Sequence, residues 1–336
     1  MMHIPGRLRL ASPCTMLMAL VLLVTFGVHL APARAQEFPA HAVRMVIPYP
    51  AGGTTDILGR TVAQRLSERW KQPVLVENRA GASGSIGAAF VARTAPDGYT
   101  LVLGNSASHG AYELLNPGKA PYDSLRDFAP ITLLAIVKQV LVVPSAGDMR
   151  SIPDLVAQAR TKAGRMNYGS SSIGGAPHLA MELFKQVAGV DIVHIPFNGA
   201  APAMTALLGG SIDVMFAAVP TATDMVRASR IRALGMASSS RSGMLPDVPT
   251  MSEAGMPGVE MDSWFGLLAP AGMTRELLAR LNADTVHAVD GDETRDSFAR
   301  LGFERATGTP EALTALMKNE RERVGRVVRQ ANIKGE

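Results

Sequence analysis

The sequence predicts an α/β protein of two lobes with mainly parallel sheets. Short β-rich runs alternate with helical patterns along the chain, which is typical of this class. The chain completes one α/β unit, builds a second and then returns to the first, so two crossing strands should join the lobes. We expect lobe 1 to comprise residues 36–139 and 261–336, and lobe 2 to comprise residues 140–260. A ligand cleft should lie between the lobes at the strand ends.

Residues 1–35 have the pattern of a secretory signal peptide. An arginine-containing start precedes a mostly apolar run over residues 16–30, and Ala33-Arg34-Ala35 is a small-x-small cleavage pattern. The apolar run is short for a membrane span and no charged stop follows it, so we expect cleavage rather than an anchor. The mature chain should start near Gln36. The single cysteine, Cys14, would leave with the signal, so the mature chain would have no thiol and no disulfide.

The charge of the mature chain argues against nucleic acid as a partner. The 336-residue chain has a formal net charge of +4 at pH 7, and residues 1–35 contribute three arginines and no acidic residue. Their removal leaves a formal charge of +1. A nearly neutral surface without a block of lysine and arginine offers no electrostatic footprint for nucleic acid.

The first unit should begin with a strand at Val43–Ile47, followed by a helix that starts near Thr54–Asp56. Apolar residues recur every four positions from Leu58 to Trp70, which predicts one buried stripe on that helix. Further buried strands are expected at Val74–Val76 and Thr100–Leu103.

The second unit should begin with a strand at Val140–Val143, after a turn-rich stretch at residues 121–130. Ser151-Ile-Pro-Asp154 has the spacing of a capping box and should start a helix that runs to about Lys162. A second helix should bury a stripe formed by Leu179, Leu183 and Val187. The rest of the unit is expected to contain strands at 191–195, 212–216 and 231–236 and a short helix at 202–208.

The chain should then return to the first unit. Proline-rich turns at residues 245–258 lead to Ser263–Pro270, which is predicted to be the returning strand. Thr274 and Thr309 are expected to start the last helices, because threonine is a favourable N-cap.

Two loops rich in glycine and hydroxyl residues are candidates for holding a small anion. One is Tyr49-Pro-Ala-Gly-Gly-Thr-Thr-Asp56 and the other is Tyr168-Gly-Ser-Ser-Ser-Ile-Gly-Gly-Ala-Pro-His178. Each follows an extended stretch and opens a helix, whose free N–H groups and dipole favour an anion. Two such helix starts facing each other could hold one carboxylate without a cationic side chain.

Eight short motifs occur in order along the mature chain. They are Tyr49–Asp56, Glu77–Gly81, Ala95–Leu101, Pro121–Pro130, Val190–Gly199, Leu208–Asp213, Leu245–Thr250 and Ser263–Pro270. With this order and spacing, the chain resembles the substrate-binding proteins of tripartite tricarboxylate transporters, also called Bug receptors, over nearly its whole length. The resemblance implies a type II periplasmic-binding-protein fold and a periplasmic receptor for a small organic carboxylate. It also implies a two-subunit membrane permease as the partner.

The resemblance and the two loops together give the expected ligand contacts. In the first lobe these are Tyr49, Gly52, Gly53, Thr54, Thr55, Asn105 and Ser106. In the second lobe they are Ser170, Ser171, Ser172, His178, Phe197, Asn198 and Ala217. Many relatives carry a basic residue where Asn198 stands, so a less highly charged or differently oriented ligand is expected.

Several of these positions also have a structural interpretation. The first loop can be an ordinary βα turn, and a plain turn explains Asn105 and Ser106 equally well. A structural hydrogen bond near the helix start is slightly favoured over ligand contact for His178. Asp56 would repel an anion, so it should favour the helix dipole or fix the loop. Asp213 is expected to be a structural turn or strand-end residue rather than an amine partner, although a zwitterionic amino acid would need such a group.

The sequence contains no convincing catalytic motif. Gly81-Ala-Ser-Gly84-Ser-Ile-Gly87 follows a strand, but its glycine spacing differs from that of a dinucleotide-binding loop. We therefore expect a receptor rather than an enzyme, without cofactor or metal, and a monomer. The alternative function is a receptor for the same class of solute that presents its closed form to a signalling sensor.

Overall fold

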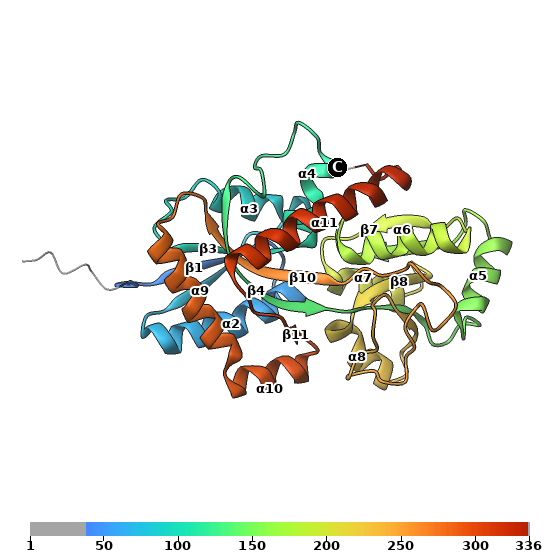
Figure 1. Cartoon of the computed structure of the whole chain (residues 1–336). Coiled ribbons are helices and arrows are strands. Elements are labelled where there is room, and N and C mark those ends of the chain that lie inside the picture. The colour runs from blue at the N-terminus through green and yellow to red at the C-terminus, as the bar shows by residue number, and fades with distance from the viewer. Residues whose placement is uncertain (1–37, 335–336) are drawn as a thin grey trace, which may run out of the picture. The chain divides into compact units, whose positions relative to one another are not determined.

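The computed structural model describes residues 38–334. The predicted signal peptide and its cleavage pattern lie outside these residues. Residues 41–334 form two mixed α/β sheets with helices packed around them (Figure 1). The predicted two-lobed α/β architecture is confirmed, but the predicted direction of the strands is partly wrong.

The first sheet has the strand order β11-β4-β10-β3-β1-β2. Its strands are β1 (Val43–Ile47), β2 (Val74–Asn78), β3 (Thr100–Asn105), β4 (Phe128–Val137), β10 (Ser263–Pro270) and β11 (Glu304–Arg305). Strand β1 pairs in parallel with β2 and β3, whereas β10 is antiparallel to both of its neighbours, β3 and β4, and β11 is antiparallel to β4. The sheet is mixed because the returning strand β10 enters it from the second lobe and runs against its neighbours.

The second sheet has the strand order β7-β6-β8-β5-β9. Its strands are β5 (Gln139–Pro144), β6 (Asn167–Ser170), β7 (Val193–Pro196), β8 (Val214–Ala218) and β9 (Ile231–Met236). Strand β6 pairs in parallel with β7 and β8, and β5 pairs antiparallel with β8 and β9.

The two sheets are joined where β4 runs into β5, with only Lys138 between the strands. The sequence had suggested a turn-rich stretch at 121–130, and β4 was missed because Pro130 lies inside it. Pro130 pairs with Leu268 next to an irregularity in the β4–β10 register, which is where a sheet tolerates a residue without an N–H. The predicted return of β10 to the first sheet is confirmed.

Ten α-helices are described around the sheets. Beside the first sheet lie α2 (Thr54–Trp70), α3 (Ser85–Val91), α4 (Tyr112–Leu115), α9 (Arg275–Asp290), α10 (Asp292–Leu301) and α11 (Pro310–Gln330). Beside the second lie α5 (Ile152–Thr161), α6 (Ala176–Ala188), α7 (Ala200–Leu208) and α8 (Val219–Arg227). Short segments η1 (Ala82–Gly84) and η2 (Ser106–Ala111) complete the first lobe.

The buried faces of the helices match the sequence patterns unequally. The stripe from Leu58 to Trp70 on α2 is buried as predicted. On α6 the prediction was wrong at Val187, which is 44% exposed, because the buried face passes through Phe184 and Ala188 instead.

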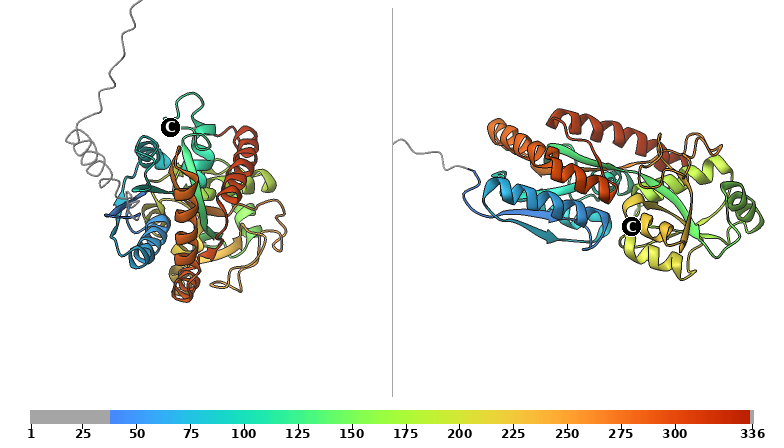
Figure 2. Two further views of the ribbon diagram at one scale, coloured as in Figure 1. Left: turned by 60° about the vertical axis from the view of Figure 1, so that its left-hand side comes forward. Right: turned by 90° about the horizontal axis from the view of Figure 1, so that it is seen from below.

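Helix α11 packs against the cores of both lobes. Leu313 and Met317 belong to a core cluster of the first sheet, whereas Val324, Val327 and Val328 belong to the core of the second lobe. Figures 1 and 2 show this helix extending from the side of β4 toward α6, and it contacts both elements. Within residues 38–334, no helix is both long enough and apolar enough to cross a membrane.

Candidate functional site

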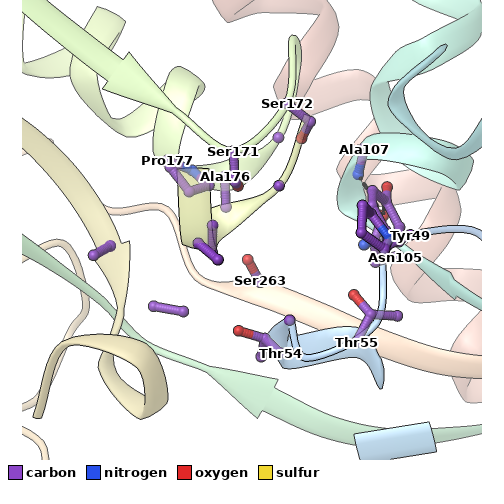
Figure 3. Close-up of a pocket in the computed structure, with 18 of the residues that line it drawn as sticks. Tyr49, Thr54, Thr55, Asn105, Ala107, Ser171, Ser172, Ala176, Pro177 and Ser263 are labelled. Carbon is purple, nitrogen blue, oxygen red and sulfur yellow. Dashed lines mark hydrogen bonds between the residues drawn. The ribbon is translucent and has the colours of Figure 1, made fainter. Parts of the chain in front are cut away.

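A pocket of about 100 Å³ lies where loops and strand ends from both sheets meet. No charged side chain lines it among the described residues. Figure 3 shows Thr54 and Thr55 on one side of the space, Ser171 and Ser172 on the other, and Ser263 between them. The predicted residues in its wall are Tyr49, Gly53, Thr54, Thr55, Asn105, Ser106, Ser171, Ser172, Asn198 and Ala217.

Four predicted residues lie elsewhere. Phe197 lines an adjoining pocket of about 420 Å³, which shares Tyr49 and Asn198 with the first. Gly52, Ser170 and His178 line neither of these two pockets.

Asp56 fixes the first loop from behind. Its carboxylate accepts hydrogen bonds from Gly52 N–H at 2.9 Å, from Arg60 Nε at 2.9 Å and from Asn78 Nδ2 at 2.8 Å. Burial works to raise the pKa of Asp56, but these hydrogen bonds outweigh it and hold the pKa below its usual value. Asp56 therefore stays ionised and its charge is satisfied within the loop, which agrees with the structural role predicted for it.

The side-chain amide oxygen of Asn105 is hydrogen-bonded within the protein. Its Oδ1 accepts hydrogen bonds from Tyr49 OH at 2.8 Å, from Ala107 N–H at 3.0 Å and from Ser108 N–H at 3.1 Å. Among the described residues, no acceptor receives a hydrogen bond from its Nδ2, so this donor is left for the pocket that Asn105 lines.

Four helices begin at the pocket wall without a side-chain cap. Their N-cap residues are Gly53 of α2, Gly175 of α6, Gly199 of α7 and Ala218 of α8. The first N–H groups of each helix therefore lack the partner that a capping side chain would supply.

Three helices that begin away from the pocket do have a side-chain cap. The N-cap residues of α5, α9 and α11 are Ser151, Thr274 and Thr309, and each side chain accepts a backbone hydrogen bond. Helices α3, α4 and α10 also lack a side-chain cap. The first turns of α4 and α10 carry acidic residues, whereas that of α3 carries none, and its N-cap Gly84 lines the adjoining pocket. The helix starts at the pocket combine missing caps with no acidic residue in their first turns, except for Asp56 of α2.

The second loop is held by a stacked pair of imidazoles, one buried and one half-buried. His178 Nδ1 accepts a hydrogen bond from Gly174 N–H at 2.9 Å, and its ring stacks on His194 at 4.0 Å. His194 Nε2 lies 2.7 Å from Ser170 Oγ. Burial lowers the pKa of His178 to about 4 and that of His194 to about 3, so neither ring is charged at neutral pH. The geometry favours the structural interpretation of His178.

Asp213 has a structural role as expected. Its Oδ2 accepts a hydrogen bond from Asn167 N–H at 2.7 Å, and Asp213 lines neither pocket. The carboxylate is therefore unavailable as a partner for an amino group in the pocket.

Sequence reasoning missed several parts of the wall. These are Gln139, Ser263 and Phe265 at the strand crossing, Met215 and Phe216 of β8, and the start of α7 at Ala200. The predicted crossing strands were a usable signal for the first three, since crossing strands form the floor of a cleft between lobes. The start of α7 was missed because no polar cap precedes it.

Among the described residues, no group of three or more histidine, cysteine or acidic side chains could hold a metal ion. The wall instead offers hydroxyl, amide and backbone N–H donors beside the apolar side chains of Pro177, Phe216 and Phe265. Such an arrangement can bind a small anion with an apolar portion.

Comparison with known proteins agrees with this geometry. Residues 58–333 match the family described as the tripartite tricarboxylate transporter family receptor. Protein BugT of Bordetella pertussis is 34% identical over 314 residues, which cover 94% of this chain and 96% of BugT.

Two solved structures from Rhodopseudomonas palustris are also similar. Rpa4515, solved with adipate, gives a TM-score of 0.85 at 34% identity and covers 89% of this chain and 99% of its own. MatC, solved with bound malate, gives a TM-score of 0.80 at 32% identity and covers 87% of this chain and 100% of its own. The chain therefore belongs to the tripartite tricarboxylate transporter receptor family, whose members include the Bug receptors.

Proposed function

We propose that the protein is a periplasmic receptor that captures a small organic carboxylate between its lobes and delivers it to a two-subunit membrane permease. The observation that carries this proposal is the meeting of four helix starts without side-chain caps at one uncharged pocket. Free N–H groups and the positive end of the helix dipole lie at the N-terminus of each helix. One carboxylate could therefore accept hydrogen bonds from several helices at once.

The relatives support this class of ligand. The two related structures described above hold adipate and malate, which are both dicarboxylates. The signal-peptide pattern of residues 1–35 supports export, and a family of transporter receptors supports a permease as the partner.

The proposed contacts come from both lobes. The hydroxyls of Thr54 and Thr55 and the Nδ2 of Asn105 act from the first lobe, and Ser171 and Ser172 act from the second. Gly52, Ser170 and His178 would support the loops from behind, and Phe197 would face the outer pocket.

Closure of the lobes is the proposed capture step. We propose boundaries at residues 139–140 and 260–261, next to the junction of β4 with β5 and the start of β10. Only a closed form lets both loops contact one ligand, so binding would shift the population toward it, and the permease would recognise that form.

Calorimetry with receptor purified from the periplasmic fraction tests the binding step. We expect at least one member of a panel of mono-, di- and tricarboxylates to bind, and Gly53→Val to weaken that binding about 10-fold or more. A Cβ at Gly53 would have only Pro50 O within 4 Å, at 3.7 Å, so the loop should accept the side chain while the pocket loses space.

Gly147→Val is the matched control. A Cβ there would also meet only a proline carbonyl, Pro144 O at 3.7 Å, and Gly147 is exposed away from the pocket. Binding should then be unchanged. A panel without any binding contradicts the receptor proposal. Cellular uptake of the bound acid that continues unchanged after deletion of the receptor contradicts delivery to a permease.

A further inference from the structure

Gln139 is a buried amide in the wall of the pocket. It is the first residue of β5, it is 0% exposed, and it pairs with Ala218 of β8. It lies at the junction of the two sheets, so its side chain reaches parts of both crossing connections.

The orientation of this amide is fixed by its neighbours. Gln139 Nε2 donates to Val137 O at 3.1 Å and to Ser263 Oγ at 3.1 Å. A backbone carbonyl can only accept, so the NH₂ group must face Val137 and the oxygen must face the other way. Among the described residues, Gln139 Oε1 has no hydrogen-bond partner. An acceptor left unpaired in a buried position is destabilising, so a partner from outside the protein is favoured.

Ser263 supplies the complementary group. Its Oγ accepts the hydrogen bond from Gln139, so its own proton remains available, and Ser263 also lines the pocket. The Gln139–Ser263 corner therefore offers one acceptor and one donor. An alcohol hydroxyl, which both donates and accepts, matches this pair.

An ammonium group fits the corner less well. No acidic side chain lines the pocket among the described residues. Asp213 lies outside the pocket, and its carboxylate accepts a hydrogen bond from Asn167 N–H. The helix starts around the pocket present positive dipole ends, which disfavour a second positive charge. A buried ammonium without a counter-charge is costly, whereas a neutral hydroxyl is not.

We infer that the Gln139–Ser263 corner recognises the hydroxyl of a hydroxy-substituted carboxylate whose carboxyl group lies at the helix starts. This inference rests on the proposed receptor function and narrows its ligand. Gln139 would then determine specificity, because it accepts a hydrogen bond that an acid without a hydroxyl cannot donate.

Matched acids that differ by one hydroxyl test the inference. We expect calorimetry to show lactate binding more tightly than propionate, or malate more tightly than succinate, by about 10-fold or more. Aspartate should bind more weakly than malate. Gln139→Met should remove most of this preference. It should weaken binding of the hydroxy acid about 10-fold and change the affinity for the matched acid without a hydroxyl by less than about 3-fold.

Gln186→Met is the control, since Gln186 is an exposed residue of α6 outside both pockets. Equal affinity for both acids of each pair in the wild-type receptor overturns the inference and leaves the receptor function standing. The inference is also overturned if Gln139→Met loses the same affinity for both acids of a pair, or if aspartate binds more tightly than malate. Failure of every carboxylate to bind contradicts the receptor function itself. If Gln139→Met does not fold, the wild-type comparison decides.

Discussion

At the scale of single residues, the hydroxyl of Tyr49 ties the pocket wall to a left-handed turn. Its oxygen lies 2.8 Å from Asn105 Oδ1 and 3.0 Å from Ser83 O, so one proton is shared between two acceptors. Ala82 and Ser83 have φ values of 44° and 53°, which cost about 1 kcal/mol each for residues with a Cβ. Burial raises the pKa of Tyr49 to about 12, which keeps the phenol neutral as a donor.

Tyr49→Phe should therefore both destabilise the protein and weaken ligand binding. The substitution removes the donor of Ser83 O, whereas Asn105 Oδ1 keeps the N–H groups of Ala107 and Ser108, so we expect a loss of about 1 kcal/mol in the free energy of unfolding. Denaturant unfolding and calorimetry measure the two effects. Tyr112→Phe is the control, because its hydroxyl makes no hydrogen bond among the described residues and lies outside both pockets. Wild-type stability in Tyr49→Phe would contradict the role of this hydroxyl.

The residues of the two loops could be predicted because glycine and hydroxyl side chains before a helix are a local signal. The structural role of Asp56 could also be predicted, since a carboxylate opposes an anion. Gln139 could not be predicted, because a single amide at the start of an apolar strand has no distinguishing pattern. Its free oxygen depends on Val137 and Ser263, and Ser263 is distant in sequence.

At the scale of elements, the helix starts at the pocket lack the local stability that a side-chain cap would supply. A serine at an N-cap satisfies N–H groups that glycine leaves free. Gly53 and Gly175 have extended backbone conformations that serine can adopt, with φ values of −83° and −71°. Under the proposed function, glycine at these positions leaves the helix N–H groups available to the ligand.

Gly53→Ser should stabilise the protein and impair the receptor. The added hydroxyl would cap α2 and raise the free energy of unfolding by about 0.5–1 kcal/mol, while carboxylate binding weakens about 10-fold. Gly291→Ser places the same change at the start of α10, where φ is −61° and the backbone is extended. It should give the gain in thermal stability without the loss of binding. Equal binding by Gly53→Ser and the wild type would show that the α2 start does not hold the ligand.

The positions of most strands along the chain and the starts of α2, α9 and α11 could be predicted from the sequence, because glycine or threonine caps and apolar stripes are local features. The antiparallel pairing of β10 and β4 was not visible, since strand direction depends on how distant segments meet. The start of α8 was missed for the same reason as that of α7, because Ala218 gives no capping signal.

At the scale of the whole molecule, buried titratable groups make stability depend on pH. Burial lowers the pKa of His109 to about 3, and His178 and His194 are lowered in the same way. Each histidine then binds a proton more readily in the unfolded chain than in the folded one below pH 6.5. Burial raises the pKa of Asp262 to about 6, so this group has the opposite effect between about pH 4 and 6.

We therefore expect the melting temperature to fall as the pH decreases from 6.5 to 5. Over this range each histidine lowers the free energy of unfolding by up to about 2 kcal/mol. Protonation of Asp262 in the folded state offsets only part of this loss. Asp262→Asn should be more stable than the wild type at pH 7.5 and should lose stability more steeply in acid. Thermal unfolding at several pH values from 5 to 8 gives the melting temperatures of the wild type and of Asp262→Asn. A constant difference between the two melting temperatures across this range would exclude the role of Asp262.

The packing of α11 restricts how the lobes can move. Its last turns bury Val324, Val327 and Val328 in the second core, while its first turns are buried with the first sheet. Burial of a valine contributes about 1.5 kcal/mol or more, so separating this end of the helix would cost several kcal/mol. Low-energy motion must keep these contacts and pivot about the helix. Under the proposed closure, the C-terminal segment would limit the lobes to pivoting about this helix, and a permease that reads the angle between the lobes would meet a similar geometry in every loaded molecule.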